Sequence, residues 1–354
     1  MKKYLFIICT SVLSAISWVS KAQDIHFSQF YDISTLRNPA LTGIFSGEYK
    51  VGIDYRNQWA AVATPYNTVS LSGETRILVN RTIADYISFG LGITYDKAGA
   101  IDFTSQEIYP AICYNKAMDD QHYTYLSVGL SGGYFARFVD MSKMTFSSQY
   151  VNRSFSGNNP SGENISYYNL HNYDVGAGVS LNSSFDLEGK TNYYIGAAVY
   201  HLNHPTEVFT GPQVLIKLPI KSEFNIGIHF NMGEQAGLSL HGNYSYQEPY
   251  TEAIFGGLLT WHNRPPRMNS NFALQIGAYY RYHDAIIPTI RFEIENVTLG
   301  FSYDVTNSSL ATAVPGAGAT EITLFVKGLY NHRKNPRDPV MCPRFDTQVY
   351  DHFR

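Results

Sequence analysis

The sequence predicts an all-β protein, a transmembrane antiparallel up-and-down β-barrel of about 14 strands with an irregular N-terminal segment and a C-terminal tail. Three observations predict this fold. Apolar and polar residues alternate through most of the chain, the long connections fall at one end of the predicted barrel, and an export signal precedes them. The composition agrees: aromatic residues make up 15% of the chain and charged residues only 16%, against about 25% in ordinary soluble domains.

Residues 1–22 have the features of a cleaved signal peptide. Two lysines precede an apolar run, and the small residues Ser20 and Ala22 mark a cleavage site before Gln23. A retained membrane anchor is the alternative, but the apolar run is short and a processing site follows it. Cleavage removes three lysines and no acids, so the formal charge changes from −3 to −6. This mild acidity argues against a nucleic-acid partner.

Residues 23–47 show no regular period and contain Asn38-Pro39-Ala40 and two turn-forming glycines, so we expect an irregular segment ahead of the sheet. Strand-like alternation then continues to residue 330. The predicted strands are residues 48–58, 66–77, 86–97, 102–115, 122–138, 172–182, 191–202, 220–231, 236–247, 251–262, 271–283, 285–294, 296–306 and 320–330.

The clearest pair of predicted strands lies within residues 284–304. Ile286 and Ile290 fall on one parity, and Arg291 and Glu293 fall on the other, which gives each strand one apolar face and one polar face. The join at residues 295–296 is so short that the two strands must be antiparallel neighbours. Strands of about 10 residues suit either a soluble sandwich or a tilted crossing of a bilayer.

The lengths of the connections favour the barrel over the sandwich. The longest connections, residues 139–171, 203–219 and 307–319, are the fifth, seventh and thirteenth in order, so all three leave the same end of an up-and-down barrel. Outer-membrane barrels have long loops outside and short turns in the periplasm, whereas a sandwich has no reason to separate them. Closure also removes the sheet edges that an open meander would expose.

On this interpretation the polar parity faces the lumen. Charges of both signs there most simply form a structural ion network, and a selective solute path is the alternative. The predicted lumenal residues are Lys50, Asp54, Arg56, Glu74, Arg76, Asp96, Arg281, Arg291, Glu293 and Asp304. Glycines on the same parity, as in Leu91-Gly92-Ile93, would make room inside the barrel.

The sequence contains no strong catalytic or metal-binding pattern. His201, His204 and Glu207 lie close in sequence, but a loop doesn't hold two histidines on one face, so we expect no metal site and no cofactor. We expect no enzyme, and an outer-membrane lipase with a triad assembled in space is the alternative. Cys113 and Cys342 are either two independent thiols or one disulfide.

Residues 331–354 depart from the alternating pattern and contain three prolines and an excess of basic over acidic residues. This tail is either a disordered periplasmic end or a docking segment for a partner. The mixed cluster Cys342-Pro343-Arg344-Phe345 favours the second explanation.

Six short stretches occur in order from the mature start to the end of the chain. They are residues 23–30, residues 38–43, Tyr55-Arg56-Asn57-Gln58-Trp59, Tyr280-Arg281 followed by residues 284–287, residues 301–304, and Cys342-Pro343-Arg344-Phe345. As a set they resemble the PorP/SprF family of type IX secretion and gliding-motility outer-membrane proteins.

This resemblance implies a non-enzymatic outer-membrane component that works with the subunits of the type IX secretion machinery. Its cargo would be a large secreted adhesin with a C-terminal sorting domain, which it helps to export or to retain at the cell surface. We expect partner contacts at residues 55–59 and 342–345. The strand count is also similar to that of fatty-acid channel barrels, which implies that residues 23–47 plug the lumen, and a channel for small hydrophobic solutes is the alternative function.

Overall fold

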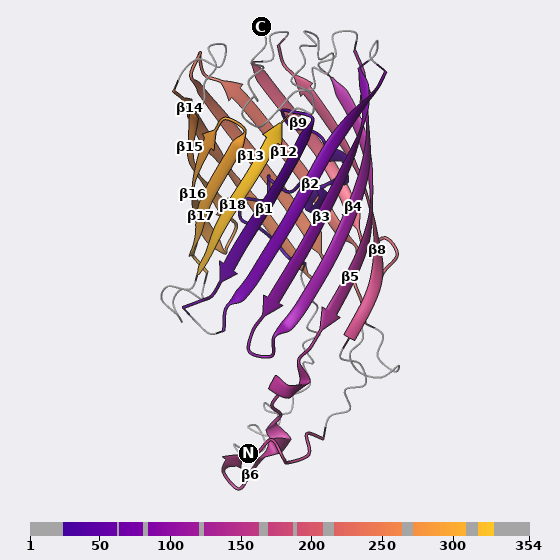
Figure 1. The fold of residues 1–354 in the computed structure, drawn as a ribbon, viewed down its shortest axis with the longest axis vertical. Helices are drawn as coiled ribbons and strands as arrows, with labels where there is room; N and C mark the ends of the chain where they lie inside the picture. Colours follow the sequence, from indigo (N-terminus) through magenta and orange to yellow (C-terminus); the bar gives the residue numbers. More distant parts are fainter. Residues whose placement is uncertain are drawn as a thin grey trace, which may run out of the picture.

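The fold is described by a computed structural model, and the structure describes residues 24–61, 64–80, 84–119, 124–162, 169–186, 190–207, 216–263, 272–308 and 318–328. Within these residues, fourteen strands form one closed antiparallel barrel (Figure 1). The first strand, β1, pairs with both the last strand β18 and the second strand β2, which closes the sheet. The barrel strands are β1 (Tyr49–Gln58), β2 (Tyr66–Asn80), β3 (Asp85–Ala98), β4 (Phe103–Ala117), β5 (Tyr125–Phe138), β8 (Asn169–Ser184), β9 (Thr191–Tyr200), β12 (Lys221–Asn231), β13 (Ala236–Gln247), β14 (Tyr250–His262), β15 (Phe272–Arg281), β16 (Ala285–Ile294), β17 (Val297–Thr306) and β18 (Gly318–Gly328).

Each of the fourteen predicted strands coincides with one barrel strand, so the predicted fold class and strand count are confirmed. The largest difference in the described residues is at β8, which begins at Asn169 rather than at residue 172. The extra residues pair with the end of β5, where Asn169 lies opposite Phe138. The predicted signal peptide, the tail, and residues 329–330 of the last predicted strand lie outside the described residues.

The alternation in the sequence separates an apolar outer face from a polar lumen. On β1, Val51 and Ile53 are 55% and 40% exposed, whereas Asp54 and Arg56 are buried. β18 repeats the pattern, with exposed Leu324 beside buried Thr323. The apolar side chains around the outer face are suited to contact with lipid tails. Because the barrel is closed, every strand is hydrogen-bonded on both sides and no strand edge faces the lipid.

The two ends of the barrel differ in their connections. We call the end with residues 59–61, 139–162 and 201–207 the long-loop end, and the end with residues 232–235 and 295–296 the short-turn end. The long-loop end is at the bottom of Figure 1. Residues 139–162 extend beyond the barrel rim there. They contain the short helices η2 (Met141–Lys143) and η3 (Ser147–Gln149) and a hairpin of β6 (Tyr150–Val151) and β7 (Ser154–Phe155). A second small hairpin, β10 (Thr206–Glu207) with β11 (Ile216–Lys217), belongs to the 201–220 connection.

Residues 24–47, which we call the lumenal segment, lie inside the barrel. The segment is irregular apart from α2 (Ser34–Arg37) and the 3-10 helix η1 (Pro39–Leu41). Its side chains and backbone form hydrogen bonds with β1, β8, β12, β16 and β18, which surround it. Ser28, Gln29 and Asn38 are fully buried. Among the described residues, no helix is long and apolar enough to span a membrane.

Candidate functional site

The lumenal segment is anchored by a group of charged side chains that we call the Arg56 cluster, made of Ser28, Arg56, Arg281, Asp304 and Glu321. The guanidinium of Arg56 lies 2.8 Å from Asp304 and 3.3 Å from Glu321. Arg281 lies 2.9 Å from the same Asp304 oxygen. The Ser28 hydroxyl donates a hydrogen bond of 2.6 Å to Asp304. Because these groups are buried, each needs its partners, and removal of one partner of such a pair typically costs about 3–5 kcal/mol.

Glu321 connects this cluster to the backbone of the lumenal segment. One carboxylate oxygen accepts the backbone N–H of Ser28 at 2.7 Å and the other accepts that of Gln29 at 2.6 Å. The strand register brings the two residues together, because Arg56 on β1 lies directly opposite Glu321 on β18. Hydrogen bonds from backbone N–H groups to a charged carboxylate are stronger than those between neutral groups. The cluster therefore fixes residues 28–29 to the wall.

A second anchor lies nearer the short-turn end. Arg291 on β16 donates to both carboxylate oxygens of Asp32, at 2.6 and 3.0 Å. The neighbouring Tyr31 ring stacks on His241 and on Tyr279, with ring centroids 5.0 and 5.2 Å apart. Lys50 donates to the backbone carbonyl of Asp32 at 2.6 Å. Residues 31–32 are thus held by a bidentate ion pair and by aromatic contacts.

The η1 turn fits against a part of the wall where two inward positions are glycines. Asn38 caps η1 by accepting the N–H of Ala40, and its amide donates to Asn225 at 2.9 Å. A β-carbon at Gly129 would lie 2.3 Å from the backbone of Pro39, and one at Gly178 would lie 2.1 Å from Asn38. Real β-carbons don't approach atoms so closely, so these inward glycines make room for the lumenal segment.

The beginning of the lumenal segment is bound near the long-loop end. His201, in the connection after β9, lies 3.0 Å from Asp24 and 3.1 Å from Asp174. Lys221 lies 3.6 Å from Asp24 and 3.0 Å from Glu223. Burial by itself would lower the pKa of His201, but the carboxylates of Asp24 and Asp174 outweigh it and raise that pKa to about 10. His201 is therefore a cation that holds the front of the segment.

All ten predicted lumenal residues lie on the inward parity, and the structure brings only some of them together. Arg56, Arg281 and Asp304 meet in one cluster, whereas Arg291 pairs with Asp32 and Glu293 lies 3.6 Å from Lys327. Of the other five, Glu74 accepts the N–H of Gly43, Arg76 is buried, and Asp96 and Lys50 are half-buried. Asp54 is buried, and neither of its carboxylate oxygens has a hydrogen-bond partner among the described residues.

Three residues that hold the lumenal segment, Ser28, Asp32 and Glu321, were not among the residues predicted from the sequence. The inward parity of Glu321 within the alternating run 320–330 was a signal that could have identified it. Ser28 and Asp32 had no such signal, because an irregular segment has no period to show which side chains face the wall.

The predicted partner-binding residues do not form one surface where the structure describes them. Tyr55 is 39% exposed on the outer face, but Arg56 is buried in the lumen. Asn57 and Gln58 end β1, and Trp59 lies beyond it with its ring 5.0 Å from that of Tyr66. Residues 342–345 lie outside the described residues. A role for either stretch in partner binding stays a prediction.

The three residues considered as metal ligands, His201, His204 and Glu207, do not form one site. His201 is buried between Asp24 and Asp174, His204 is exposed, and Glu207 pairs with Arg137. Within the described ranges, no group of three or more His, Cys, Asp or Glu side chains has metal-binding geometry. Cys113 is buried, and its thiol lies 3.6 Å from the carbonyl oxygen of Ala40, whereas Cys342 lies outside the described part of the chain.

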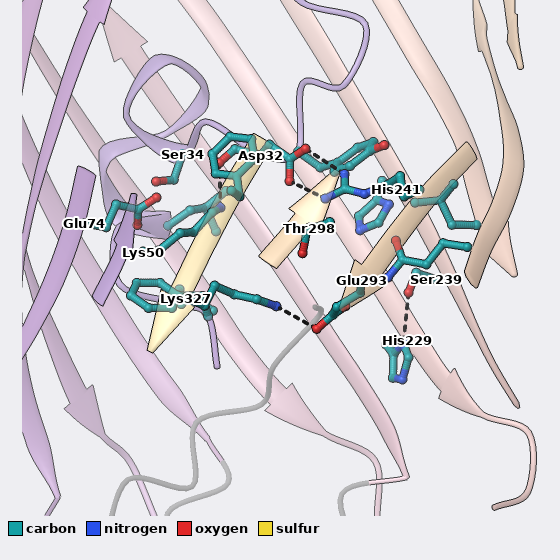
Figure 2. Close-up of a pocket in the computed structure, with 18 of the residues that line it drawn as sticks. Asp32, Ser34, Lys50, Glu74, His229, Ser239, His241, Glu293, Thr298 and Lys327 are labelled. Atoms are coloured by element: carbon teal, nitrogen blue, oxygen red, sulfur yellow. Dashed lines mark hydrogen bonds and ion pairs between the residues drawn. The ribbon is translucent and has the colours of Figure 1, made fainter. Parts of the chain in front are cut away.

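Two cavities flank the lumenal segment. The larger, of about 100 Å³, opens toward the short-turn end, where Asp32, Lys50, Glu293 and Lys327 line it (Figure 2). The smaller, of about 60 Å³, lies toward the long-loop end between the segment and β12, β13 and β14. Spaces of this size admit water and small solutes but no polypeptide domain. The lumen in this conformation is therefore filled and mostly polar.

One solved structure shows the same fold, and two others are similar with lower scores. A FadL homologue from Pseudomonas aeruginosa is similar with a TM-score of 0.51 and 7% identity, covering 83% of this chain and 93% of that one. The Pseudomonas putida toluene transporter TodX gives a TM-score of 0.48 and 10% identity, covering 83% and 92%. The Ralstonia pickettii toluene transporter TbuX gives 0.46 and 10%, also covering 83% and 92%. At these identities the similarity concerns the fold alone.

No curated protein matches the chain. A family model described as "Type IX secretion system membrane protein PorP/SprF" matches residues 19–325, which include the described lumenal segment and nearly the whole barrel.

Proposed function

Because this chain belongs to the PorP/SprF family of type IX secretion system membrane proteins, we propose that it helps to export or anchor a large cell-surface adhesin. The family implies an outer-membrane component of type IX secretion that associates with the secretion machinery. Neither the family nor the fold is that of a known enzyme class. The finer proposal is that the protein binds one adhesin with a C-terminal sorting domain, and that this display supports gliding.

The observation that carries the proposal is the family match over residues 19–325. The filled lumen supports a binding role rather than a conduit for the cargo. Four separate sets of contacts hold residues 24–47, and the two cavities beside them measure about 100 and 60 Å³. An exported domain would have to displace the entire segment, so we propose that the adhesin contacts the protein outside the lumen.

Residues 139–162 are the surface we propose for this contact. This connection extends from the long-loop end, which faces the cell exterior if the short turns lie in the periplasm. Tyr150, Val151 and Phe155 on the β6–β7 hairpin are 60%, 47% and 48% exposed. Exposed apolar and aromatic side chains on a hairpin outside the bilayer are typical of protein-binding surfaces.

The alternative, a channel for small hydrophobic solutes, has less support. Both cavities are lined by charged side chains, among them Lys50 and Glu293 in the larger and Lys221 and Glu252 in the smaller. A site for an apolar solute is lined mainly by apolar side chains.

The test is surface display of the adhesin in the native bacterium. Deletion of the gene should abolish display of one adhesin and gliding, and the wild-type gene should restore both. A gene with Tyr150, Val151 and Phe155 changed to serine should restore the barrel in the membrane but not the display. Met118→Ser, which changes an apolar residue of 56% exposure directly after β4 at the short-turn end, is the control and should restore display. Normal display in the deletion strain would refute the proposal, and normal display with the triple variant would remove the hairpin from it.

A further inference from the structure

We propose that Arg37 forms a binding site for a small carboxylate at the place where the two lumenal cavities meet. This site does not depend on the proposed role in secretion, because only the charges and contacts inside the lumen form it.

Arg37 lies at the boundary between the cavities. It is the last residue of α2 in the lumenal segment, and it lines both the larger and the smaller cavity. Its side chain is 8% exposed. The guanidinium carbon lies 5.3 Å from the centre of the Tyr194 ring and 5.8 Å from that of Phe30. An ion that entered from either cavity would therefore meet the same guanidinium.

The charge of Arg37 has no carboxylate partner in the part of the chain that the structure describes. Four other buried arginines each lie within ion-pair distance of at least one acid, namely Arg56, Arg137, Arg281 and Arg291. Among the described residues no acid lies within 4.0 Å of Arg37. Its side chain makes one hydrogen bond, from Nη1 to the Tyr194 hydroxyl at 2.9 Å, and its Nε has no acceptor. A buried cation without a counterion is costly, so an anion supplied from solution would stabilise it.

The acids that line the two cavities do not serve as that counterion, because each is bound elsewhere. In the larger cavity Asp32 pairs with Arg291, Glu293 faces Lys327, and Glu74 accepts the N–H of Gly43. In the smaller cavity the pairs are Asp24 with His201 and Lys221, Glu223 with Lys221, and Glu252 with Arg281. Each of these acids is bound by another group, so none of them serves as a counterion for Arg37.

The geometry of the free edge indicates the class of ligand. The Tyr194 hydroxyl accepts from Nη1, whereas Nε is buried and the Nε–Nη2 edge of the guanidinium has no acceptor among the described residues. This edge presents two parallel N–H groups and matches the two oxygens of a carboxylate. Cavities of about 100 and 60 Å³ limit the ligand to a small molecule. Phe30 and Leu36 line the smaller cavity and can contact a short alkyl group. The site therefore suits a carboxylate of a few carbon atoms.

The experiment measures binding of acetate to the full chain, folded in detergent micelles, by titration calorimetry at constant ionic strength. Acetamide, which has nearly the same shape and no charge, is the matched ligand. The wild type should bind acetate saturably and should not bind acetamide. Arg37→Gln should weaken acetate binding by about tenfold or more, because it removes the charged fork. Arg153→Gln, on the exposed hairpin, should bind as the wild type does.

Two further variants separate binding from folding. Tyr194→Phe frees Nη1 and keeps the guanidinium, so acetate binding should persist. Arg37→Lys keeps the charge and loses the fork, so it should bind more weakly than the wild type and more strongly than Arg37→Gln. Heat-modified electrophoretic migration reports for each variant whether the barrel is folded. Absence of saturable acetate binding to the folded wild type, equal binding of acetamide, or wild-type affinity in folded Arg37→Gln would each overturn the proposal.

Discussion

The substitution Glu321→Ala tests whether the Arg56 cluster fixes the lumenal segment. Glu321 accepts the backbone N–H groups of Ser28 and Gln29 at 2.7 and 2.6 Å and lies 3.3 Å from Arg56. Alanine leaves two buried N–H groups without an acceptor and removes one of the acids facing Arg56. Removal of one partner from a buried network costs about 3–5 kcal/mol. Since β18 keeps its backbone ladder, this cost should act on the segment and not on the barrel.

Hydrogen–deuterium exchange of the detergent-solubilised protein measures the effect. If opening of residues 24–32 breaks this contact, the loss of about 3–5 kcal/mol increases the opening equilibrium, and with it the exchange rate, roughly 100- to 4000-fold. Asp96→Asn is the matched control, because Asp96 also faces the lumen but hydrogen-bonds to Thr68 on the wall. Its exchange in residues 24–32 should equal that of the wild type. Unchanged exchange in Glu321→Ala, with the barrel folded, would refute the assignment of this cluster as the main anchor.

Three further predictions concern the wall, the outer face and pH. Gly129→Ala should increase exchange of the lumenal segment, since a β-carbon there would lie 2.3 Å from its backbone, whereas Gly132→Ala on the outward side of the same strand has nothing within 4 Å and should not. Leu324→Lys should destabilise the barrel in lipid vesicles by about 2–4 kcal/mol, because it places a charge in the middle of the lipid-facing band. Met141→Lys, in the connection after β5, is the control, and equal stability of the two variants would contradict the assignment of Leu324 to the lipid-facing side. The pKa of His201 is raised from 6.5 to about 10. The stabilisation that its charge gives to the lumenal segment is therefore complete below pH 6.5 and is lost as the pH rises through about 10. The exchange rate at the front of the lumenal segment, divided by the intrinsic rate of an unfolded chain at the same pH, should therefore increase over that range in the wild type. It should increase less in His201→Asn.

The period of two in the sequence determined the strands and their two faces. In residues 284–304, the alternation of Ile286 and Ile290 with Arg291 and Glu293 assigned the outer and inner faces that the structure shows. The order of long and short connections favoured a closed barrel over a sandwich, and the pairing of β1 with β18 confirmed it. These features are local, because side-chain direction along a strand depends only on its own backbone.

The partners inside the lumen were decided only by the tertiary structure. Parity shows that Arg56 and Arg291 face inward, but it doesn't show that Arg56 meets Glu321 and Ser28 while Arg291 meets Asp32. Those residues are more than 200 positions apart in sequence, or belong to a segment without a period. Their contacts arise when the barrel closes around residues 24–47, which sets the distances between inward side chains of different strands. The unpaired Arg37 has the same origin, since a missing counterion can be recognised only when all the neighbours of a side chain are known.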